Sequence, residues 1–548
     1  MKVIFSIVCL IASSMNAYGS SADTLTKIQN LIHQVEIEEI SSEDALLSMG
    51  EREIDLLIKP SVLSFEKDAI SIEALCLSSG AVQGVLCFDL KEIPRLKAIN
   101  PSIIWVTSKI SNDDLCHLSE INGIFALRED PSSHAVIVTR VSNIPLLSLP
   151  KDVEQVGKTL VTSIGILKEG DEVTLDAFNG KLFPSLYPLH YPVNSLALDR
   201  IMDWADLHAK IEVHAGADTG EEAKLGLNFG ALGMDPRTEH MFFHPDRLFL
   251  FRKVILLESK SRKNLEELKE LQKRDFIEMY QAMGNRPAKI RLLDPPLHEF
   301  LPDQEEAIKE LAHELEVSFS FLQEKIAKLK EVNPMMGHRG IRLLLTHPEI
   351  LKMQVRSIFE ASLDPSVKDY QIEPYINLPM VICEKEMALA KEWIEQVKSE
   401  VEQEFQTTIT YHLGAMMETP RACLMAETIA PYVDFVSFGT NDLTGQTLAL
   451  SRGDIYEKFL KFYFESDILS YDPFSDLDPA VAELMQITIR KLRAADHPIT
   501  IGICGEQGAQ KSGVFLCHAM GIDSISCAST RIPVVKLFAA QAAILSKR

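Results

Sequence analysis

The spacing of apolar positions changes along the chain. In residues 24–60 apolar side chains recur every three or four positions, which predicts amphipathic helices. Two later stretches, 257–282 and 303–331, are also helical in pattern, and their mixed charges predict solvent-facing helix surfaces. Between residues 70 and 185 short β-branched runs are separated by turn signals such as Asn179-Gly180. That segment predicts a compact, strand-rich α/β domain.

From residue 206 onward, short apolar strands alternate with helical stretches. Eight strand candidates lie at residues 211–217, 231–236, 289–294, 372–379, 408–418, 435–442, 499–506 and 524–529. Eight strand–helix units predict a closed parallel (β/α)8 barrel. The fold class is therefore α/β. The predicted organisation is a segment at 1–22, a helical linker at 23–70, the strand-rich domain at 71–185, a second linker at 186–205 and the barrel at 206–548.

Polar residues follow five of the predicted barrel strands. In such a barrel the functional residues gather where the strands end, because the loops that follow are free to vary. The second predicted strand ends near Arg237, and the third contains Arg291 with Asp294 at its exit. The fifth ends at Glu418, the sixth at Asn441-Asp442 and the seventh near Cys504. We expect these side chains to meet at one mouth of the barrel.

This set of residues suits phosphoryl transfer through an enolate. Two carboxylates, Glu418 and Asp442, suit Mg²⁺, which takes few protein oxygens and completes its shell with water and substrate. Separate arginines fork onto phosphate or carboxylate oxygens; the candidates are Arg237, Arg291 and Arg339. The Cys504 thiol would deliver a proton to carbon.

Each of these residues also has a structural interpretation. A buried cysteine usually serves packing. Glu418 and Asn441-Asp442 are also placed to cap the helices that follow them. Arg237 with Glu239 would form a surface pair of little energetic worth. The combination of these residues, more than any one of them, favours function.

In the strand-rich domain, Ser132-Ser133-His134-Ala135 opens an apolar segment. A histidine near a helix start can carry a phosphoryl group, which nearby amide groups hold. The alternative is a plain capping serine ahead of a half-exposed histidine. If the first interpretation holds, His134 carries a phosphoryl group to the barrel.

The first residues resemble a secretory signal. Lys2 precedes an apolar run over residues 3–12 and small residues near Gly19. A poorly ordered apolar tail, or the remnant of an upstream domain, is the alternative. No later stretch reaches about 18 uninterrupted apolar residues, so we predict no transmembrane helix.

The net charge and the distribution of cysteines exclude some classes of protein. The 55 basic and 78 acidic side chains give a net charge of −23, which argues against a protein that coats nucleic acid. The nine cysteines are sparse, most lie in apolar runs and none forms a C-x-x-C pair, so we predict reduced, buried thiols.

Eight distinctive motifs follow one another along the chain. They are SSHAVIVTR (132–140), GALGMDPRTEHMFF (230–243), IRLLDPPLHEFLP (290–302), NPMMGHRG (333–340), GAMMETPRA (414–422), FVSFGTNDLT (435–444), LSRGD (450–454) and GICGEQG (502–508). In this order they resemble the phosphoenolpyruvate-utilising enzymes, and among them the pyruvate, phosphate dikinase family. The similarity begins near residue 24 and continues to the C-terminus.

The resemblance implies a swivelling phosphohistidine domain followed by a barrel that binds phosphoenolpyruvate or pyruvate with Mg²⁺. It implies that His134 is phosphorylated, that Cys504 protonates the enolate, and that Glu418 and Asp442 hold magnesium. It assigns substrate contacts to Arg237, Arg291, Arg339, Glu418, Gly439, Thr440, Asn441 and Asp442. It also implies a homodimer and a cytoplasmic enzyme, whereas the N-terminal pattern indicates export.

The chain departs from this family in several places. The dikinases begin with an ATP-grasp nucleotide domain that this sequence does not include, so we expect the ATP-dependent half of the reaction to need a separate nucleotide-binding chain. Arg128-Glu129-Asp130-Pro131 stands where a glycine pair is usual. The other departures are Asp235-Pro236 in place of an apolar residue and a cysteine, Gln507 in place of a histidine, and Gly445 in place of a glutamine.

Three functional hypotheses follow. The first is a Mg-dependent phosphotransferase that acts between phosphoenolpyruvate and His134. The second is a truncated, non-catalytic relative that binds phosphoenolpyruvate or a partner nucleotide-domain chain. The third is chemistry of the barrel alone, which needs Cys504 and not His134.

Overall fold

The computed structural model describes residues 20–66, 69–108, 110, 117–118, 120–127, 136, 139, 142–148, 153–192, 195–257, 261–331, 333, 336–451 and 459–548. His134 and the first 19 residues of the signal-like segment lie outside the described residues. The chain divides into two compact units. One comprises Met1–Ala209 with Pro533–Arg548, and the other Lys210–Ile532.

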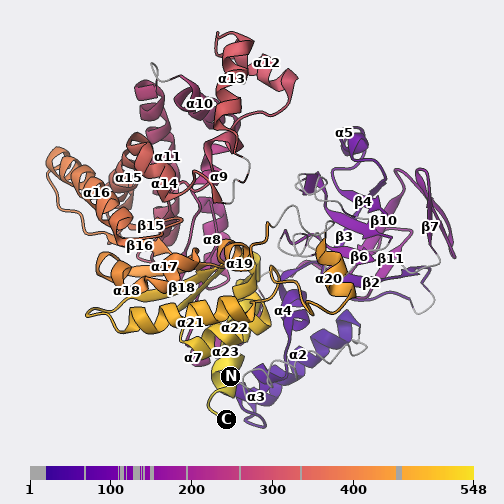
Figure 1. The fold of residues 1–548 in the computed structure, drawn as a ribbon. Helices are drawn as coiled ribbons and strands as arrows, with labels where there is room; N and C mark the ends of the chain where they lie inside the picture. The colour runs from indigo at the N-terminus through magenta and orange to yellow at the C-terminus, as the bar shows by residue number, and fades with distance from the viewer. Residues whose placement is uncertain are drawn as a thin grey trace. The chain divides into compact units, whose positions relative to one another are not determined.

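The second unit is built on eight parallel strands, drawn from magenta to yellow in Figure 1. They are β12 (Glu212–Ala215), β13 (Gly233–Met234), β14 (Lys289–Arg291), β15 (Tyr375–Leu378), β16 (His412–Met416), β17 (Phe435–Gly439), β18 (Thr500–Cys504) and β19 (Ser524–Cys527). Each lies within one of the eight predicted ranges.

The order of these strands makes a barrel. From β14 to β19 each strand pairs with the next in the chain, and β19 then pairs with β12, which pairs with β13. Two isolated parallel bridges, Met234 to Ala288 and Arg237 to Arg291, join the outer edges of the sheet. The predicted (β/α)8 architecture is confirmed, and it brings the C-terminal ends of all eight strands to one face.

Helices cover the outside of the barrel. The main ones are α8 (Gly220–Asn228), α9 (Glu239–Phe242), α10 (Pro245–Leu256), α11 (Ser261–Met283), α12 (Glu305–Glu314), α13 (Phe319–Leu329), α14 (Ile341–Thr346), α15 (Pro348–Ser362), α16 (Glu384–Phe405), α17 (Pro420–Leu424), α18 (Ala426–Ile429), α19 (Thr440–Leu448), α20 (Lys461–Glu465), α21 (Pro479–Arg493) and α22 (Lys511–Met520). Figure 1 shows α12 and α13 projecting beyond the barrel beside α10. None of the described helices is both long and apolar enough to cross a membrane.

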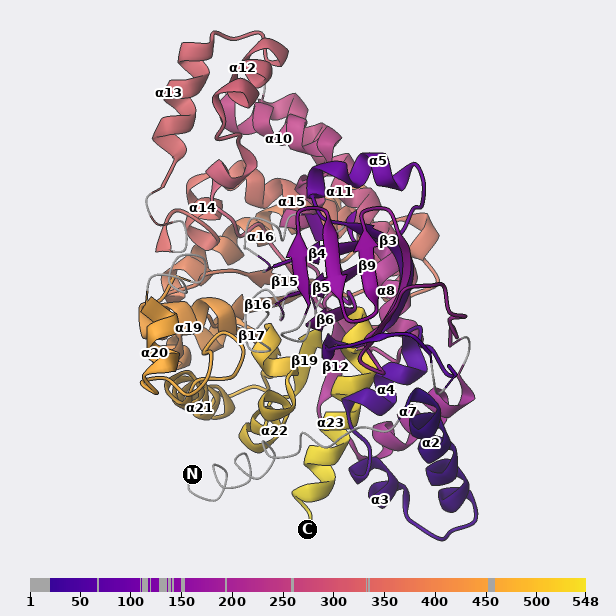
Figure 2. The same cartoon turned by 90° about the vertical axis from the view of Figure 1, so that its right-hand side faces the viewer.

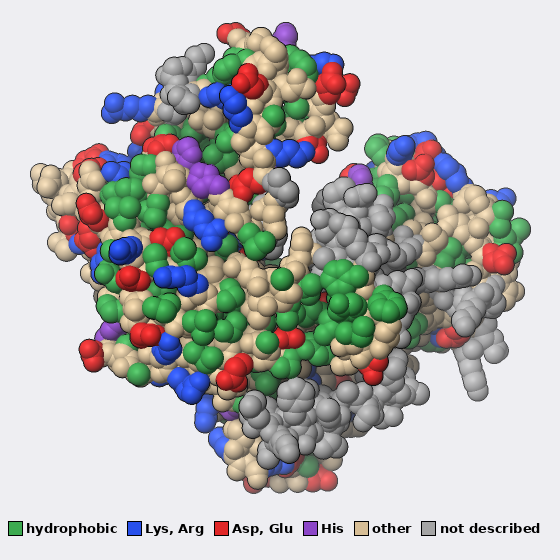
Figure 3. All heavy atoms as spheres, viewed as in Figure 1, with side chains coloured by type: hydrophobic (Ala, Val, Ile, Leu, Met, Phe, Trp, Pro, Cys, Tyr) green, Lys and Arg blue, Asp and Glu red, His purple; other side chains and the backbone are tan. Residues whose placement is uncertain are grey.

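Charges of both signs are interspersed over the visible face of this unit (Figure 3). The prediction of a solvent-facing surface is nevertheless wrong for part of α11. Lys269 is only 7% exposed, and its Nζ lies 3.4 Å from Oε1 of the buried Glu360 on α15. A lysine is buried in this way when its aliphatic stem packs and a carboxylate meets its charge.

The first unit contains the predicted strand-rich domain. Its larger sheet has the order β1-β11-β10-β3-β4-β5-β6-β2. The strands are β1 (Ile72–Glu73), β2 (Leu75–Ser78), β3 (Ala81–Cys87), β4 (Ile103–Thr107), β5 (Gly123–Ala126), β6 (Leu146–Ser148), β10 (Glu172–Asp176) and β11 (Lys181–Phe183). Strands β3 to β6 run parallel, and Figure 2 shows them side by side. A small antiparallel sheet adds β7 (Glu154–Val156), β8 (Thr159–Thr162) and β9 (Gly165–Lys168).

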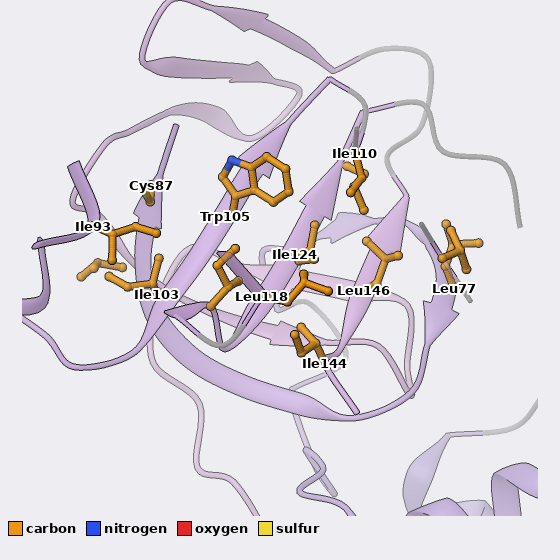
Figure 4. Close-up of a cluster of buried hydrophobic side chains, with 14 of the residues drawn as sticks. Leu77, Cys87, Ile93, Ile103, Trp105, Ile110, Leu118, Ile124, Ile144 and Leu146 are labelled. Atoms are coloured by element: carbon orange, nitrogen blue, oxygen red, sulfur yellow. The ribbon is translucent and has the colours of Figure 1, made fainter. Parts of the chain in front are cut away.

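Apolar cores cover both faces of this sheet. On one face Trp105 and Ile103 of β4 pack with Leu146 and the helix α5 (Ile93–Lys97), as Figure 4 shows. The alternate residues of β4, Ile104 and Val106, belong to the core on the other face. Parallel strands buried on both faces are continuously apolar, which is the pattern that the β-branched runs of the sequence displayed.

The predicted helical stretch at 24–60 is three helices. They are α2 (Ser21–Glu36), α3 (Ser42–Leu47) and α4 (Glu51–Ile58). The stretch is interrupted because Ser41 caps α3, its side chain accepting a hydrogen bond from the Asp44 amide. Two further helices complete this part of the first unit, α7 (Leu196–His208) and α23, which runs from Ile532 to Leu545.

None of the seven described cysteines forms a disulfide. Four of them are buried, whereas Cys76 is exposed. The prediction of buried thiols is therefore wrong for Cys76, although it holds for the majority.

Candidate active site

Arg339 connects the loops that follow two barrel strands. It lies just before α14 and is 7% exposed. Its Nη2 is 2.5 Å from Asp294 Oδ2, beyond β14, and its Nη1 is 2.9 Å from Asp442 Oδ1, on the first turn of α19. The Gly340 amide also donates to the Asp294 carbonyl at 2.8 Å. Two charge-assisted contacts therefore fix this guanidinium group between two strand ends.

Arg291 forms the second buried ion pair of the barrel mouth. It ends β14, where its Nη2 donates to Glu239 on α9 and its Nη1 lies 3.7 Å from Asp294 Oδ2. Burial alone would lower its pKa, but the charges of Glu239 and Asp294 hold the pKa well above its usual value. Asp294 thus serves both buried arginines.

Arg237 is more accessible, with 47% of its side chain exposed. Its Nη2 and backbone amide both donate to Asp218, at 3.1 and 2.8 Å. Burial would raise the pKa of Asp218, but the hydrogen bond from His240 and the charge of Arg237 bring it down to about 2. Asp218 therefore stays ionised and orients a guanidinium group that a ligand can reach.

Glu418 lies at the end of β16 and is 1% exposed. The Met380 amide donates to its Oε1 at 2.6 Å. A Cβ on Gly439 would come 2.2 Å from its Oε2, so only glycine fits at the end of β17. Burial and the nearby charges of Asp294 and Asp442 raise the pKa of Glu418 to about 8, although Arg291 and Arg339 lower it.

The junction between β17 and α19 supplies three polar side chains in succession. Thr440 Oγ1 donates to Gln507 Oε1 at 2.7 Å, and Asn441 Nδ2 donates to Glu506 Oε2 at 3.1 Å. Burial raises the pKa of Asp442, although Arg339 acts in the opposite direction. Within the described residues the Asn441 Oδ1 atom is buried without a partner.

Cys504 is the last residue of β18, and its Sγ lies 3.6 Å from the Phe438 carbonyl oxygen. Burial raises its pKa to about 12; Arg291 lowers it, and Asp235 and Glu418 raise it further. The side chain is therefore a protonated thiol at neutral pH, which suits a proton donor and does not suit a nucleophile.

The carboxylates outnumber the guanidinium groups in the buried part of this site. Among the described residues, the carboxyl groups of Glu239, Asp294, Glu418 and Asp442 lie near two guanidinium groups, those of Arg291 and Arg339. This surplus of negative charge fits a divalent cation held by Glu418 and Asp442. In the described part of the chain no three His, Cys, Asp or Glu side chains are grouped so that they would hold a metal ion. A cation here would thus need water or substrate oxygens, as Mg²⁺ usually does.

The structure brings together nearly all the residues that the sequence singled out. His134 lies outside the described residues. Of the other predicted site residues, most are at the C-terminal end of a barrel strand, just beyond it, or in the first turn of the helix that follows, whereas Arg339 lies between α13 and α14. Sequence analysis gave no role to Asp218, Glu506 and Gln507. The interpretation of Arg237 with Glu239 as a surface pair is wrong, because Glu239 is buried and binds Arg291, while Arg237 binds Asp218. Asp218 directly follows the first predicted strand, which was the signal that would have identified it.

Two protein families and several known proteins match this chain in sequence. The family described as PEP-utilising enzyme, PEP-binding domain, matches residues 194–544, and the family described as PEP-utilising enzyme, mobile domain, matches residues 99–180. The pyruvate, phosphate dikinase of Rhizobium meliloti (strain 1021) is 37% identical over 512 residues, which cover 92% of this chain and 57% of that protein. The pyruvate, phosphate dikinase of Clostridium symbiosum is 36% identical over 517 residues, which cover 93% and 59%.

The chain therefore spans less than two thirds of the length of these two relatives. Among solved structures, a citrate lyase from Burkholderia xenovorans LB400 superposes on 60% of this chain and 76% of its own, with a TM-score of 0.32 and 12% identity. A TM-score this low supports no conclusion about function.

Proposed function

The chain belongs to the phosphoenolpyruvate-utilising enzymes, and from this premise we propose that it transfers the phosphoryl group of phosphoenolpyruvate to a histidine and releases pyruvate. One observation carries the proposal: three arginines, two carboxylates and a protonated thiol, from separate strand ends and the segments beyond them, lie at one mouth of a barrel. Each of these groups has a task in the reaction.

The arginines bind the substrate anion. Arg237 is exposed and offers a guanidinium group to the phosphoryl oxygens. The largely buried Arg291 and the buried Arg339 provide positive charge near the bond that breaks. As the phosphoryl group leaves, the electrons of the broken P–O bond remain on the substrate as the enolate of pyruvate. Magnesium held by Glu418 and Asp442 would supply positive charge that stabilises this enolate.

Cys504 completes the reaction. Its thiol gives a proton to the methylene carbon of the enolate, which forms the methyl group of pyruvate and leaves a thiolate. The raised pKa of the thiol supports this role, because the group keeps its proton until a strongly basic carbon is next to it. In the reverse direction the thiolate removes the same proton from pyruvate.

The proposed acceptor is His134, which falls within the residues that the mobile-domain family matches. Purified protein incubated with magnesium and phosphoenolpyruvate labelled in its phosphoryl group should gain an acid-labile label and release an equal amount of pyruvate. The label should be lost in His134→Ala. It should persist in His117→Ala, a control because His117 is a half-exposed histidine of the same unit that pairs with Glu120.

A second candidate is a relative that binds phosphoenolpyruvate without turnover. The acidic segment before His134, Glu129-Asp130, favours it, because carboxylates there would repel a phosphohistidine. Magnesium-dependent binding measured by calorimetry, with no label and no pyruvate, would establish this candidate and contradict the first.

A further inference from the structure

Polar side chains fill part of the barrel interior close to Cys504. His214 on β12 is fully buried, with its Nδ1 3.1 Å from Asp235 Oδ1 and its Nε2 3.3 Å from Glu212 Oε2. A Cβ on Gly233 would lie 2.6 Å from the His214 ring, so the neighbouring strand makes room for this ring with a glycine. Branched apolar residues dominate most such interiors. Charged side chains at this position in a barrel are therefore unusual.

The strand register places Ser526 between this charged cluster and Cys504. On β19 it lies opposite His214 of β12 on one side and opposite Cys504 of β18 on the other. Residues opposite one another on neighbouring strands place their side chains on the same face of the sheet. Neighbouring strands lie about 4.8 Å apart. Figure 2 shows β12 and β19 side by side. Asp235 accepts a hydrogen bond from Ser526, and its charge acts on Cys504.

Carboxylate groups lie on two sides of the His214 ring. Both nitrogens of His214 face carboxylate oxygens, and a ring that donates from both nitrogens is an imidazolium. Burial would raise the pKa of Asp235, but His214, Lys289 and Ser526 together bring it below its usual value. The hydrogen bond to His214 likewise lowers the pKa of Glu212. Lys289 is a further charged group that acts on Asp235 and Glu212, and its Nζ lies 3.2 Å from Ser524 Oγ.

We propose that His214 is the proton store that reloads Cys504, with Asp235 and Ser526 as the path between them. This inference rests on the proposed function. After Cys504 has protonated the enolate, the His214 Nδ1–H bond breaks and the proton passes to Asp235. Asp235 hands a proton to the Ser526 oxygen while the Ser526 hydroxyl proton moves to Sγ. Imidazolium and thiolate thus become neutral imidazole and thiol.

The proposed proton store at His214 meets solvent at the end of the barrel opposite the substrate residues. Glu212, the partner of Nε2, is the first residue of β12, and 56% of its side chain is exposed. The substrate residues lie at the opposite, C-terminal ends of the strands. Protons from bulk water therefore reach the ring without passing the mouth where phosphoenolpyruvate binds. His214, Asp235 and Ser526 act through Cys504 and are positioning and proton-supplying residues.

Two isotopes measured in one reaction test the relay. The protein is incubated in D₂O with magnesium, phosphoenolpyruvate and ¹⁴C-pyruvate. Movement of ¹⁴C into phosphoenolpyruvate reports the phosphoryl transfer itself. Deuterium in the pyruvate methyl group reports exchange of the Cys504 proton with solvent. When the relay is broken, the thiol returns the same proton to carbon, so we expect the ratio of deuterium incorporation to ¹⁴C exchange to fall about tenfold or more in His214→Asn.

Asp235→Asn and Ser526→Ala should lower the same ratio. Ser526→Ala removes a single oxygen atom, so the test does not depend on how the His214 variant folds. Lys269→Met, which breaks a buried ion pair on α11, is the matched control and should keep the wild-type ratio. A wild-type ratio in folded His214→Asn or in Ser526→Ala, or a parallel fall of both signals, would overturn the relay. Absence of ¹⁴C exchange in the wild-type protein would instead overturn the proposed function.

Discussion

At the scale of single residues, Glu418 makes stability depend on pH. Its folded-state pKa of about 8 lies above its ordinary value of 4.5, so between these pH values the native protein binds a proton that the unfolded chain does not. The free energy of unfolding of the metal-free protein should therefore fall as pH rises through that window, by at most about 1.4 kcal/mol per pH unit. Hydrogen exchange of the β16–β18 amides at pH 6 and pH 8 measures this fall.

Glu418→Gln removes the titrating group while keeping its size. The difference in unfolding free energy between pH 6 and pH 8 should shrink in this variant. Added Mg²⁺ should stabilise the wild-type protein more at pH 8 than at pH 6, since the cation competes with the proton for the same carboxylate. An equal pH dependence in both proteins would contradict the assignment.

Asp294 shows why the sequence identified only part of the site. The sequence placed it at the exit of a predicted strand, and that placement is correct. Its importance comes from Arg339, which lies 45 residues later in the chain and reaches it only after α12, α13 and the return loop are in place. Strand ends follow from local patterns, whereas a shared ion-pair partner depends on tertiary structure.

At the scale of elements, the barrel strands were predictable and the helix boundaries less so. Each strand is a short apolar run with a polar end, which a sequence displays directly. The break between α2, α3 and α4 depends on single capping groups, such as the Ser41 hydroxyl. The burial of Lys269 on α11 was also not predictable. Two of its carboxylate partners are on the same polar helix, and the buried one, Glu360, lies on α15.

The junction of β17 with α19 is the element most sensitive to substitution. In Gly439→Ala the new Cβ would meet Glu418 Oε2 at 2.2 Å and Glu418 Cβ at 2.9 Å, so the carboxylate must move. A displacement of about 1 Å at a reacting centre costs on the order of 100-fold in rate. We expect a loss of that size in the exchange of ¹⁴C-pyruvate into phosphoenolpyruvate.

Gly216→Ala is the matched control, because a Cβ there meets its nearest atom at 3.4 Å, an ordinary contact. Its exchange rate should stay near that of the wild-type protein. If Gly439→Ala exchanges as fast as Gly216→Ala, the Glu418 carboxylate does not take part in the reaction at its present position.

At the scale of the whole molecule, the proposed function divides the chemistry between the two matched domains. The barrel unit holds the substrate arginines, the carboxylate pair and the thiol, whereas His134 belongs to the domain matched at residues 99–180. The barrel also separates its own tasks by end. Substrate groups lie at the C-terminal ends of the strands, and Glu212, where the proposed proton store meets solvent, begins β12.

The first unit is discontinuous in sequence, because residues 533–548 join residues 1–209. Gln541 on α23 is 3% exposed, and its Nε2 donates to the carbonyl oxygens of Leu46 and Met49 at 2.8 and 2.9 Å. Gln541→Leu leaves both acceptors buried without this donor, which should cost about 2 kcal/mol. The loss should appear as faster hydrogen exchange of the α3 amides.

Exchange at the barrel strands β16–β18 should not change in Gln541→Leu, since they belong to the other unit. Gln396→Leu, on the exposed side of α16, is the matched control and should shift stability by less than about 0.5 kcal/mol. If Gln541→Leu accelerated exchange equally in α3 and in the barrel strands, the two units would unfold as one, and the C-terminal helix would not stabilise the first unit locally. Unchanged exchange in α3 would mean that water replaces the lost donor.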